Sequence, residues 1–260
     1  MARSTGLSQA IFAIFAIFAS PQLSHYHNFC YGIVALAAVD DMAPSDDENE
    51  KLSHADFWNQ RYAEAEGDQP THEWFRSFQD LEAFFDQKLF GTRPPETAPR
   101  LLHLGSGDST VPQELAEKGY NHQLCVDFSA VVVDLMSKRH AEIKGIEWKK
   151  LDVRHMDDIP PSSIDVAFDK GTLDAMIHGS PWNPPDDVKK NTSEYLREVF
   201  RVLKDDGMFL YVTYRQPHFI RPLLNCEGTD WDIDMDVLGA GDSSFAYHGF
   251  ALTKRSGAGQ

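Results

Sequence analysis

Residues 101–109 carry the clearest fold signal in the chain: Leu101-Leu102-His103-Leu104-Gly105-Ser106-Gly107-Asp108-Ser109. The short apolar run predicts a buried strand. The two glycines predict a tight turn, because glycine tolerates positive φ and lets a ligand approach the backbone closely. A helix is expected to follow over residues 110–118. Strand, glycine turn and helix in this order are typical of nucleotide-binding α/β folds, although Thr110 stands where the dinucleotide fingerprint has its third glycine.

Strands and helices keep alternating downstream of this turn. Apolar segments predict strands, and amphipathic segments predict helices; the strands cover residues 100–104, 122–126, 146–151, 164–168 and 208–213, and the helices 129–140, 188–203 and 217–224. Residues 231–237 and 245–254 alternate apolar and polar side chains and predict a terminal hairpin. The alternation predicts an α/β fold with a mostly parallel sheet and helices on both faces.

Two helices are predicted upstream of the glycine turn. Residues 53–66 place aromatic side chains on one helix face, with Ser53 as the N-cap. Residues 74–90 repeat apolar side chains along one side and end at a glycine. The proline-rich residues 92–99 predict a linker to the first strand.

The chain divides into three parts by composition. Residues 1–41 form an apolar tail that is either signal-like or upstream of a true start at Met42. Its two apolar runs are each shorter than the roughly 20 residues that cross a bilayer, so no stable membrane span is expected. Residues 42–99 are predicted to form an N-terminal helical cap, and residues 100–260 the core.

Charge and cysteine content exclude several classes of protein. The chain has 260 residues, with 24 basic and 40 acidic side chains, and a formal charge of −16. This balance argues against a nucleic-acid partner, which needs clustered Lys and Arg, and is compatible with a basic protein partner or a small ligand. The three cysteines are too widely spaced for a disulfide framework or a metal cluster. A cytoplasmic location and no metal are expected.

Carboxylates follow three successive predicted strands. Asp127, Asp152 and Asp169 each stand at the carboxyl end of a strand, where open parallel sheets bind ligands. Asp127 lies 20 residues beyond Gly107, the spacing at which an acidic side chain accepts hydrogen bonds from ribose hydroxyls. Asp108 in the glycine turn would repel a diphosphate. A nucleoside with a cationic tail, such as S-adenosylmethionine, therefore fits better than a nicotinamide dinucleotide.

Several motifs together resemble one family. Asp169-Lys170-Gly171-Thr172-Leu173-Asp174-Ala175 looks like the motif after strand four in seven-β-strand methyltransferases that modify lysines of translation elongation factor 1-alpha. Further segments match that family in the same order: residues 57–62, 73–75, 105–109, 128–133, 152–154 and 217–219. The resemblance, which is nearest to the elongation factor 1-alpha lysine methyltransferase 4 and methyltransferase-like 13 family, implies a Rossmann-like class I methyltransferase fold. That fold has a mostly parallel seven-stranded sheet with an antiparallel last strand.

The resemblance also implies contacts to the methionine end of S-adenosylmethionine. Trp58, Tyr62 and Trp74 would close over the sulfonium, because aromatic faces attract cations. Packing of the same side chains in a helix core is the alternative. Gly105 and Gly107 would give the methionine tail access to the backbone.

The resemblance implies a separate group of contact residues for the nucleoside end of S-adenosylmethionine. Asp127 would bind the ribose hydroxyls, and Phe128 would lie beside the adenine. Asp152 and Val153 would hold the adenine edge.

The acceptor side is defined less closely. Asp169 or Lys170 would lie where donor and substrate meet, and no residue is nominated as the catalytic base. The expected activity is protein-lysine N-methylation, and the partner that the resemblance implies is a basic protein, elongation factor 1-alpha. A small-molecule methyltransferase and a non-catalytic, methyltransferase-like binding protein remain as alternatives. The target lysine, the degree of methylation and the oligomeric state do not follow from the sequence.

Overall fold

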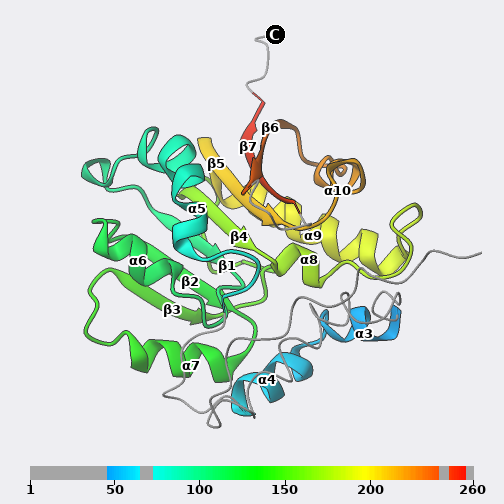
Figure 1. Ribbon diagram of the computed structural model, residues 1–260, viewed down its shortest axis with the longest axis horizontal. Helices are drawn as coiled ribbons and strands as arrows, with labels where there is room; N and C mark the ends of the chain where they lie inside the picture. Colours follow the sequence, from blue (N-terminus) through cyan, green and yellow to red (C-terminus); the bar gives the residue numbers. More distant parts are fainter. Residues whose placement is uncertain (1–45, 65–72, 240–245, 256–260) are drawn as a thin grey trace, which may run out of the picture. The chain divides into compact units, whose positions relative to one another are not determined.

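The computed structural model describes residues 46–64, 73–239 and 246–255, and its centre is one seven-stranded sheet. The strand order is β3-β2-β1-β4-β5-β7-β6 (Figure 1). The strands are β1 Leu101–Leu104, β2 Gln123–Asp127, β3 Ile146–Lys150, β4 Ile164–Lys170, β5 Leu203–Thr213, β6 Trp231–Leu238 and β7 Tyr247–Lys254. All pairs from β3 to β5 are parallel, and β7 runs antiparallel to both β5 and β6. The predicted mostly parallel sheet with an antiparallel last strand is confirmed.

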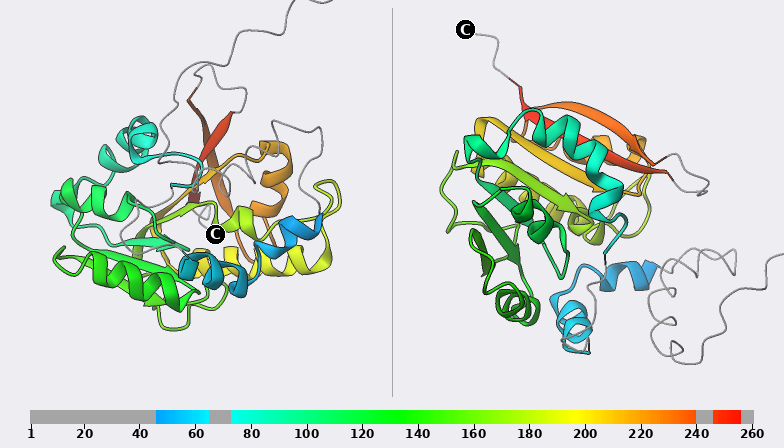
Figure 2. Two further views of the ribbon diagram at one scale, coloured as in Figure 1. Left: turned by 60° about the horizontal axis from the view of Figure 1, so that its bottom comes forward. Right: turned by 60° about the vertical axis from the view of Figure 1, so that its left-hand side comes forward.

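Helices cover both faces of the sheet (Figure 2). The α-helices are α3 Asp46–Lys51, α4 Ala55–Glu64, α5 Phe78–Phe85, α6 Val111–Glu117, α7 Ala130–Arg139, α8 Thr172–Ala175, α9 Asp186–Val202 and α10 Pro217–Leu224. A π-helical turn, Asp86–Phe90, extends α5, and a 3₁₀ turn, Pro95–Thr97, precedes β1. Side chains of α5 and α6 form one apolar layer with β1, β4 and β5. Those of α9 and α10 form a second layer on the opposite face.

The central strands are buried because helices exclude water from both of their faces. Every side chain of β1 and of β2 is buried, which explains why these segments are mostly apolar and do not alternate with exposed polar residues. Their carboxyl ends meet at one edge of the sheet, where β1 leads into the glycine turn and β2 ends at Asp127. The site described below lies at this edge.

Several predicted boundaries differ from the structure, most by one or two residues, and three of them have a clear physical reason. Ser53 does not cap α4, which begins at Ala55; its hydroxyl donates to the carbonyl of Glu50 instead. The helix predicted from residue 74 begins at Phe78, because Ser77 and Asp80 form a capping box there. Strand β5 begins at Leu203 rather than residue 208, since Leu203 already pairs with Ile164 before a register shift. The short helices α3 and α8 were not predicted.

Three predictions concern residues outside the described ranges. The tail over residues 1–41 lies there, as do residues 65–66 at the end of the helix predicted over 53–66, and Phe245, the first residue of the predicted last strand. No helix in the described part of the chain is long and apolar enough to span a membrane.

Candidate active site

The glycine turn after β1 is held in shape by contacts from two other segments. Gly105 has φ +60° and Gly107 φ +52°, a region that residues with a side chain rarely adopt. A Cβ at Gly105 would lie 2.2 Å from Oγ1 of Thr172, and one at Gly107 would lie 2.7 Å from the hydroxyl of Tyr62. Thr172 and Tyr62 therefore occupy the space that side chains here would need. Both glycines are required by the protein's own packing as well as by any ligand.

Asp127 ends β2 directly beside this turn. Its side chain is buried and accepts two backbone hydrogen bonds, from Gly107 N at 3.0 Å and Ser129 N at 2.9 Å. A carboxylate offers about four acceptor positions, so two remain for ligand hydroxyls. Burial raises the pKa of Asp127 to about 6, the N–H groups of Ser129 and Gly107 lower it, and the charge of Asp108 adds to the rise. The carboxylate lies where the sequence predicts a ribose contact.

The predicted aromatic cluster forms over the turn. Trp58 and Tyr62 of α4 stack with ring centroids 5.8 Å apart, and Trp74 meets Trp58 edge-on at 5.6 Å. The indole nitrogen of Trp58 donates to the carbonyl of Leu52 at 2.7 Å, which fixes the ring. Because the Tyr62 hydroxyl reaches Gly107, the cluster lies against the glycine turn. The structure thus brings together the residues predicted for the methionine end.

Glu73 connects several segments at this edge, although no role is predicted for it from the sequence. Its carboxylate accepts from Ser109 Oγ at 2.9 Å, from Thr110 Oγ1 at 3.0 Å and from the Thr110 backbone N–H. It also pairs with Lys170 Nζ at 2.7 Å, and Lys170 donates to the carbonyl of Trp74 at 2.8 Å. Burial raises the pKa of Glu73, but the charge and hydrogen bond of Lys170, together with the hydrogen bonds from Thr110 and Ser109, leave the pKa below its usual value.

These contacts join three segments. Glu73 ties the residues before α5 to the start of α6, and Lys170 ties the same residues to the end of β4. The signal for this ion pair in the sequence was that Glu73, in the motif at 73–75, and Lys170, in the motif at 169–175, carry opposite charges. Their pairing could not be inferred, because the two residues are 97 positions apart in the chain.

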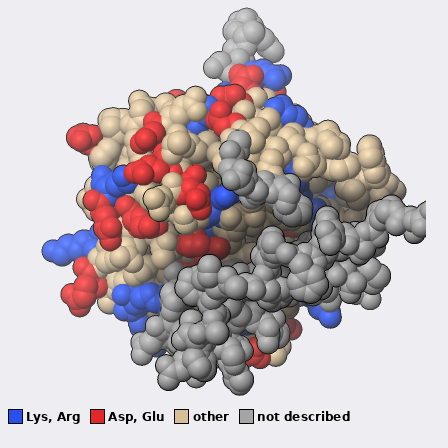
Figure 3. Space-filling view, in the orientation of Figure 1, with Lys and Arg blue, Asp and Glu red and all other residues tan. Residues whose placement is uncertain are grey.

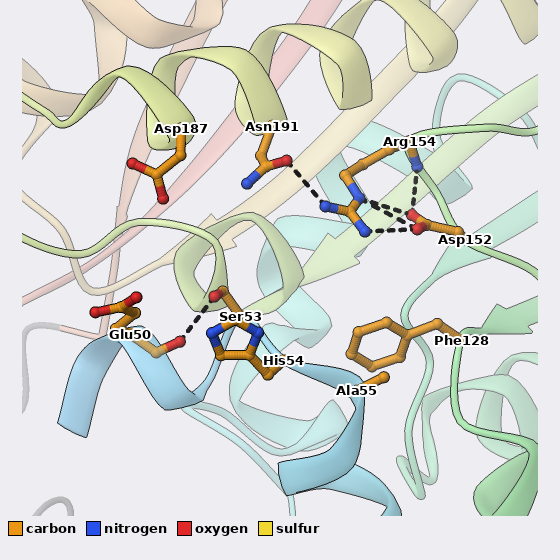
Figure 4. Close-up of a pocket in the computed structure, with 9 residues that line it drawn as sticks. All are labelled: Glu50, Ser53, His54, Ala55, Phe128, Asp152, Arg154, Asp187 and Asn191. Carbon is orange, nitrogen blue, oxygen red and sulfur yellow. Dashed lines mark hydrogen bonds and ion pairs between the residues drawn. The ribbon is translucent and has the colours of Figure 1, made fainter. Parts of the chain in front are cut away.

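The adenine-side residues lie around a pocket of about 290 Å³ (Figure 4). Phe128 and Asp152 line it, opposite Ser53 and His54, which lie between α3 and α4. Figure 4 shows Arg154 reaching from Asp152 toward α9; it pairs with Asp152 at 2.7 Å. Phe128 and Asp152 therefore border the same cavity, and their contact with adenine stays a prediction.

Two details of this pocket qualify the predicted adenine contacts. Arg154 holds the Asp152 carboxylate through its guanidinium and its backbone N–H, and also donates to Asn191 Oδ1 at 2.9 Å. The side chain of Val153 is buried in the apolar layer of α9 and α10. Only the backbone of Val153 is left to meet a ligand.

Asp169 is turned into the protein. Its carboxylate accepts from the backbone N–H groups of Thr172 at 2.8 Å and Leu173 at 2.9 Å, and from the hydroxyl of Tyr195 at 2.7 Å. Burial raises its pKa to about 7, while the hydrogen bond from Tyr195 lowers it and the charge of Asp174 raises it. Asp169 thus supports the start of α8, and Lys170 supports Glu73. Their predicted place between donor and substrate stays a prediction.

A metal centre does not form among the residues placed by the structure. Within 46–64, 73–239 and 246–255, no group of three or more His, Cys, Asp or Glu side chains is arranged to hold an ion. The site offers a buried carboxylate, a glycine turn, an aromatic cluster and an adenine-sized pocket along one edge.

Comparisons with known proteins agree with this arrangement. A family model described as "Methyltransferase domain" matches residues 96–235. The chain is 33% identical over 210 residues to EEF1A lysine methyltransferase 4 of Mus musculus, covering 80% of this chain and 78% of that protein. It is 28% identical to the eEF1A lysine and N-terminal methyltransferase of Danio rerio, over 78% of this chain and 28% of that protein. A SAM-dependent methyltransferase of Leishmania major has the same fold, with TM-score 0.56 and 13% identity, covering 80% of this chain and 91% of that one.

Proposed function

Since this chain belongs to the methyltransferase-domain family, alongside the EEF1A lysine methyltransferases, and is an S-adenosylmethionine-dependent methyltransferase, we propose that it methylates a lysine of translation elongation factor 1-alpha. One observation carries the choice of substrate: the similarity to EEF1A lysine methyltransferase 4 extends over most of both chains. The similarity includes the residues before β1 that build the site, not only the sheet. When bound, S-adenosylmethionine supplies a methyl group activated by its sulfonium.

The residues at the sheet edge fit this donor. Asp127 retains acceptor positions for two ribose hydroxyls, and Gly105 in the glycine turn is partly exposed, so its backbone is available to the methionine tail. Trp58 and Trp74 present aromatic faces, which attract a sulfonium. Phe128 and Asp152 border a cavity of about 290 Å³, large enough for an adenine ring.

The reaction requires a neutral amine, because only the unprotonated nitrogen has a free lone pair. A free lysine has a pKa near 10.4, so the enzyme must favour loss of the proton, and desolvation does this. The enzyme must also align the amine nitrogen with the methyl carbon and the sulfur, and alignment contributes much of the rate in such transfers.

The charge of the molecule suits a basic protein as substrate. The chain carries a formal charge of −16, and acidic side chains gather over α5 and α6 in the view of Figure 3. Complementary charge raises the association rate with a basic partner more than it raises affinity. The acidic surface therefore supports a protein acceptor without identifying its lysine.

Asp127→Asn is expected to weaken donor binding about tenfold or more at pH 7.5, the loss of charge-assisted hydrogen bonds worth about 1.5–3 kcal/mol. Because ribose hydroxyls donate to the ionised carboxylate, wild-type affinity should fall as pH drops through about 6, the pKa of Asp127. The asparagine variant should lack this dependence. Calorimetry with S-adenosylhomocysteine from pH 5 to 8 measures both. An unchanged affinity in the variant would remove the ribose role from Asp127.

The proposed activity is tested by incubating the purified protein and tritiated S-adenosylmethionine with recombinant elongation factor 1-alpha. We expect label in the elongation factor, on a lysine located by mass spectrometry. An extract passed through the same assay tests other acceptors. If label appears only in small molecules, the protein is a small-molecule methyltransferase and the proposed substrate is wrong. Failure to bind donor would indicate a non-catalytic binding protein.

A further inference from the structure

Exposed apolar side chains gather at one edge of the sheet. Among the described residues, the large hydrophobic side chains that are exposed are Trp182 at 80%, Val237 at 56% and Tyr214 at 44%. Tyr214 follows the end of β5, and Val237 is next to the end of β6. Trp182 lies between α8 and α9 and packs edge-on against Phe219 of α10, with ring centroids 4.8 Å apart. Tyr214 and Val237 thus lie at the carboxyl ends of strands, the edge that also carries the donor site.

Tyr214 belongs to a second aromatic cluster at this edge. The ring of Phe75 lies 5.3 Å from that of Tyr214 and 5.7 Å from that of Tyr247. Phe75 adopts φ +62° although it is not glycine, a conformation that costs about 1–3 kcal/mol and tends to occur at functional sites. A Cβ at Gly171 would lie 3.1 Å from the Phe75 ring. Phe75 is therefore held directly over the end of β4.

This second cluster is continuous with the donor site. Trp74, at the outer edge of the donor cluster, and Phe75 are neighbours in the chain, with ring centroids 6.4 Å apart. The backbone of Trp74 is fixed by Lys170 at 2.8 Å. An acceptor that passes Phe75, Tyr214 and Tyr247 would thus arrive beside Trp74. It would meet the end of the donor site that is opposite the pocket of Phe128 and Asp152.

We propose that Phe75, Tyr214 and Tyr247 form the acceptor entrance, the subsite that takes the lysine side chain of the protein substrate. The inference rests on the proposed function and adds the residues that receive the amine. The 44% exposure of Tyr214 fits a folded protein as the acceptor, because a small molecule would not need apolar contacts outside the site.

The chemistry of these rings suits an alkylamine. Their faces already accommodate cations: the guanidinium of Arg76 lies 4.4 Å from the Tyr247 ring centre, and that of Arg215 lies 5.3 Å from the Tyr214 ring centre. Arg215 is partly neutralised by the buried Asp174 at 3.4 Å. Aromatic walls therefore bind the methylene chain, attract the ammonium as it approaches and remove water from it. Removal of water favours the neutral amine that accepts the methyl group.

The test compares Tyr214→Ala with the wild type in methyl transfer to elongation factor 1-alpha. Tyr214 is half exposed, so its removal should not affect folding. We expect Tyr214→Ala to raise the KM for the protein acceptor about tenfold, as loss of an aromatic contact residue does. The Kd for S-adenosylhomocysteine should stay within twofold. Tyr214→Phe, which keeps the ring, should restore the KM.

Phe90→Ala is the matched control. It removes a half-buried aromatic ring that packs against Tyr120, away from the strand ends, and should leave the acceptor KM unchanged. Equal acceptor kinetics for Tyr214→Ala and wild type would overturn the acceptor entrance, as would an equal loss in Phe90→Ala. A wild-type protein that binds donor but labels no elongation factor would contradict the proposed function first, and the inference with it.

Discussion

Glu73→Ala is expected to lower the free energy of unfolding by about 3–5 kcal/mol, the effect of removing one partner from a buried ion pair. Lys170 and Glu73 have side chains only 5% and 17% exposed, so the remaining ammonium would be buried without its counter-charge. Ser109 and Thr110 would lose their acceptor at the start of α6. Urea unfolding followed by tryptophan fluorescence measures the loss.

The matched control is another Glu–Lys pair in the same protein. Glu82 pairs with Lys118 at 2.8 Å, but their side chains are 47% and 38% exposed. Glu82→Ala should cost no more than about 1 kcal/mol, since exposed ion pairs contribute little. Adding Lys170→Met to Glu73→Ala should recover part of the loss, because the unpaired charge is removed. Similar losses in Glu73→Ala and Glu82→Ala would show that burial of the Glu73 pair has no special effect.

Gly105→Ala should also destabilise the fold, by about 2–6 kcal/mol. The left-handed backbone at φ +60° accounts for about 1–3 kcal/mol. The contact of the new Cβ with Thr172 Oγ1, at 2.2 Å, adds about 1–3 kcal/mol of overpacking. Thermal unfolding of the single variant and of Gly105→Ala with Thr172→Ala separates the two parts. The double variant should recover only some of the packing part, because the Cβ of residue 172 would still lie 2.9 Å from the new Cβ, and it should keep the backbone part.

Gly107→Ala provides the contrast. The atom that its Cβ would meet is the hydroxyl of Tyr62 at 2.7 Å, the end of a side chain. Gly107→Ala combined with Tyr62→Phe should therefore fold with a smaller loss and still bind S-adenosylhomocysteine less tightly than the wild type. If Gly105→Ala proved as stable as the wild type, Thr172 would not be what requires a glycine there.

The order of strands and helices followed from local sequence alone. Strands β1 and β2 could be predicted from their mostly apolar residues, because both faces of a central parallel strand are buried. The glycine turn could be recognised in the sequence because its backbone geometry requires glycine. Asp127, 20 residues beyond Gly107, could be recognised because binding of ribose hydroxyls requires an acidic side chain there. Helix starts were harder to predict from the sequence. The apolar pattern begins at Trp74, but the capping box formed by Ser77 and Asp80 starts helix α5 at Phe78.

The connections within the site depended on residues brought together by folding. Glu73 and Lys170 are 97 positions apart, Tyr195 reaches Asp169 across 26 positions, and Thr172 lies against Gly105. The periodicity of the sequence does not reveal such pairs. Their energy comes from burial and from the electrostatic interaction between the partners, and both exist only after the chain has packed. Local chemistry was therefore enough to predict a donor site, whereas the side chains that hold this edge in shape, and the rings over the end of β4, could be identified only in the folded structure.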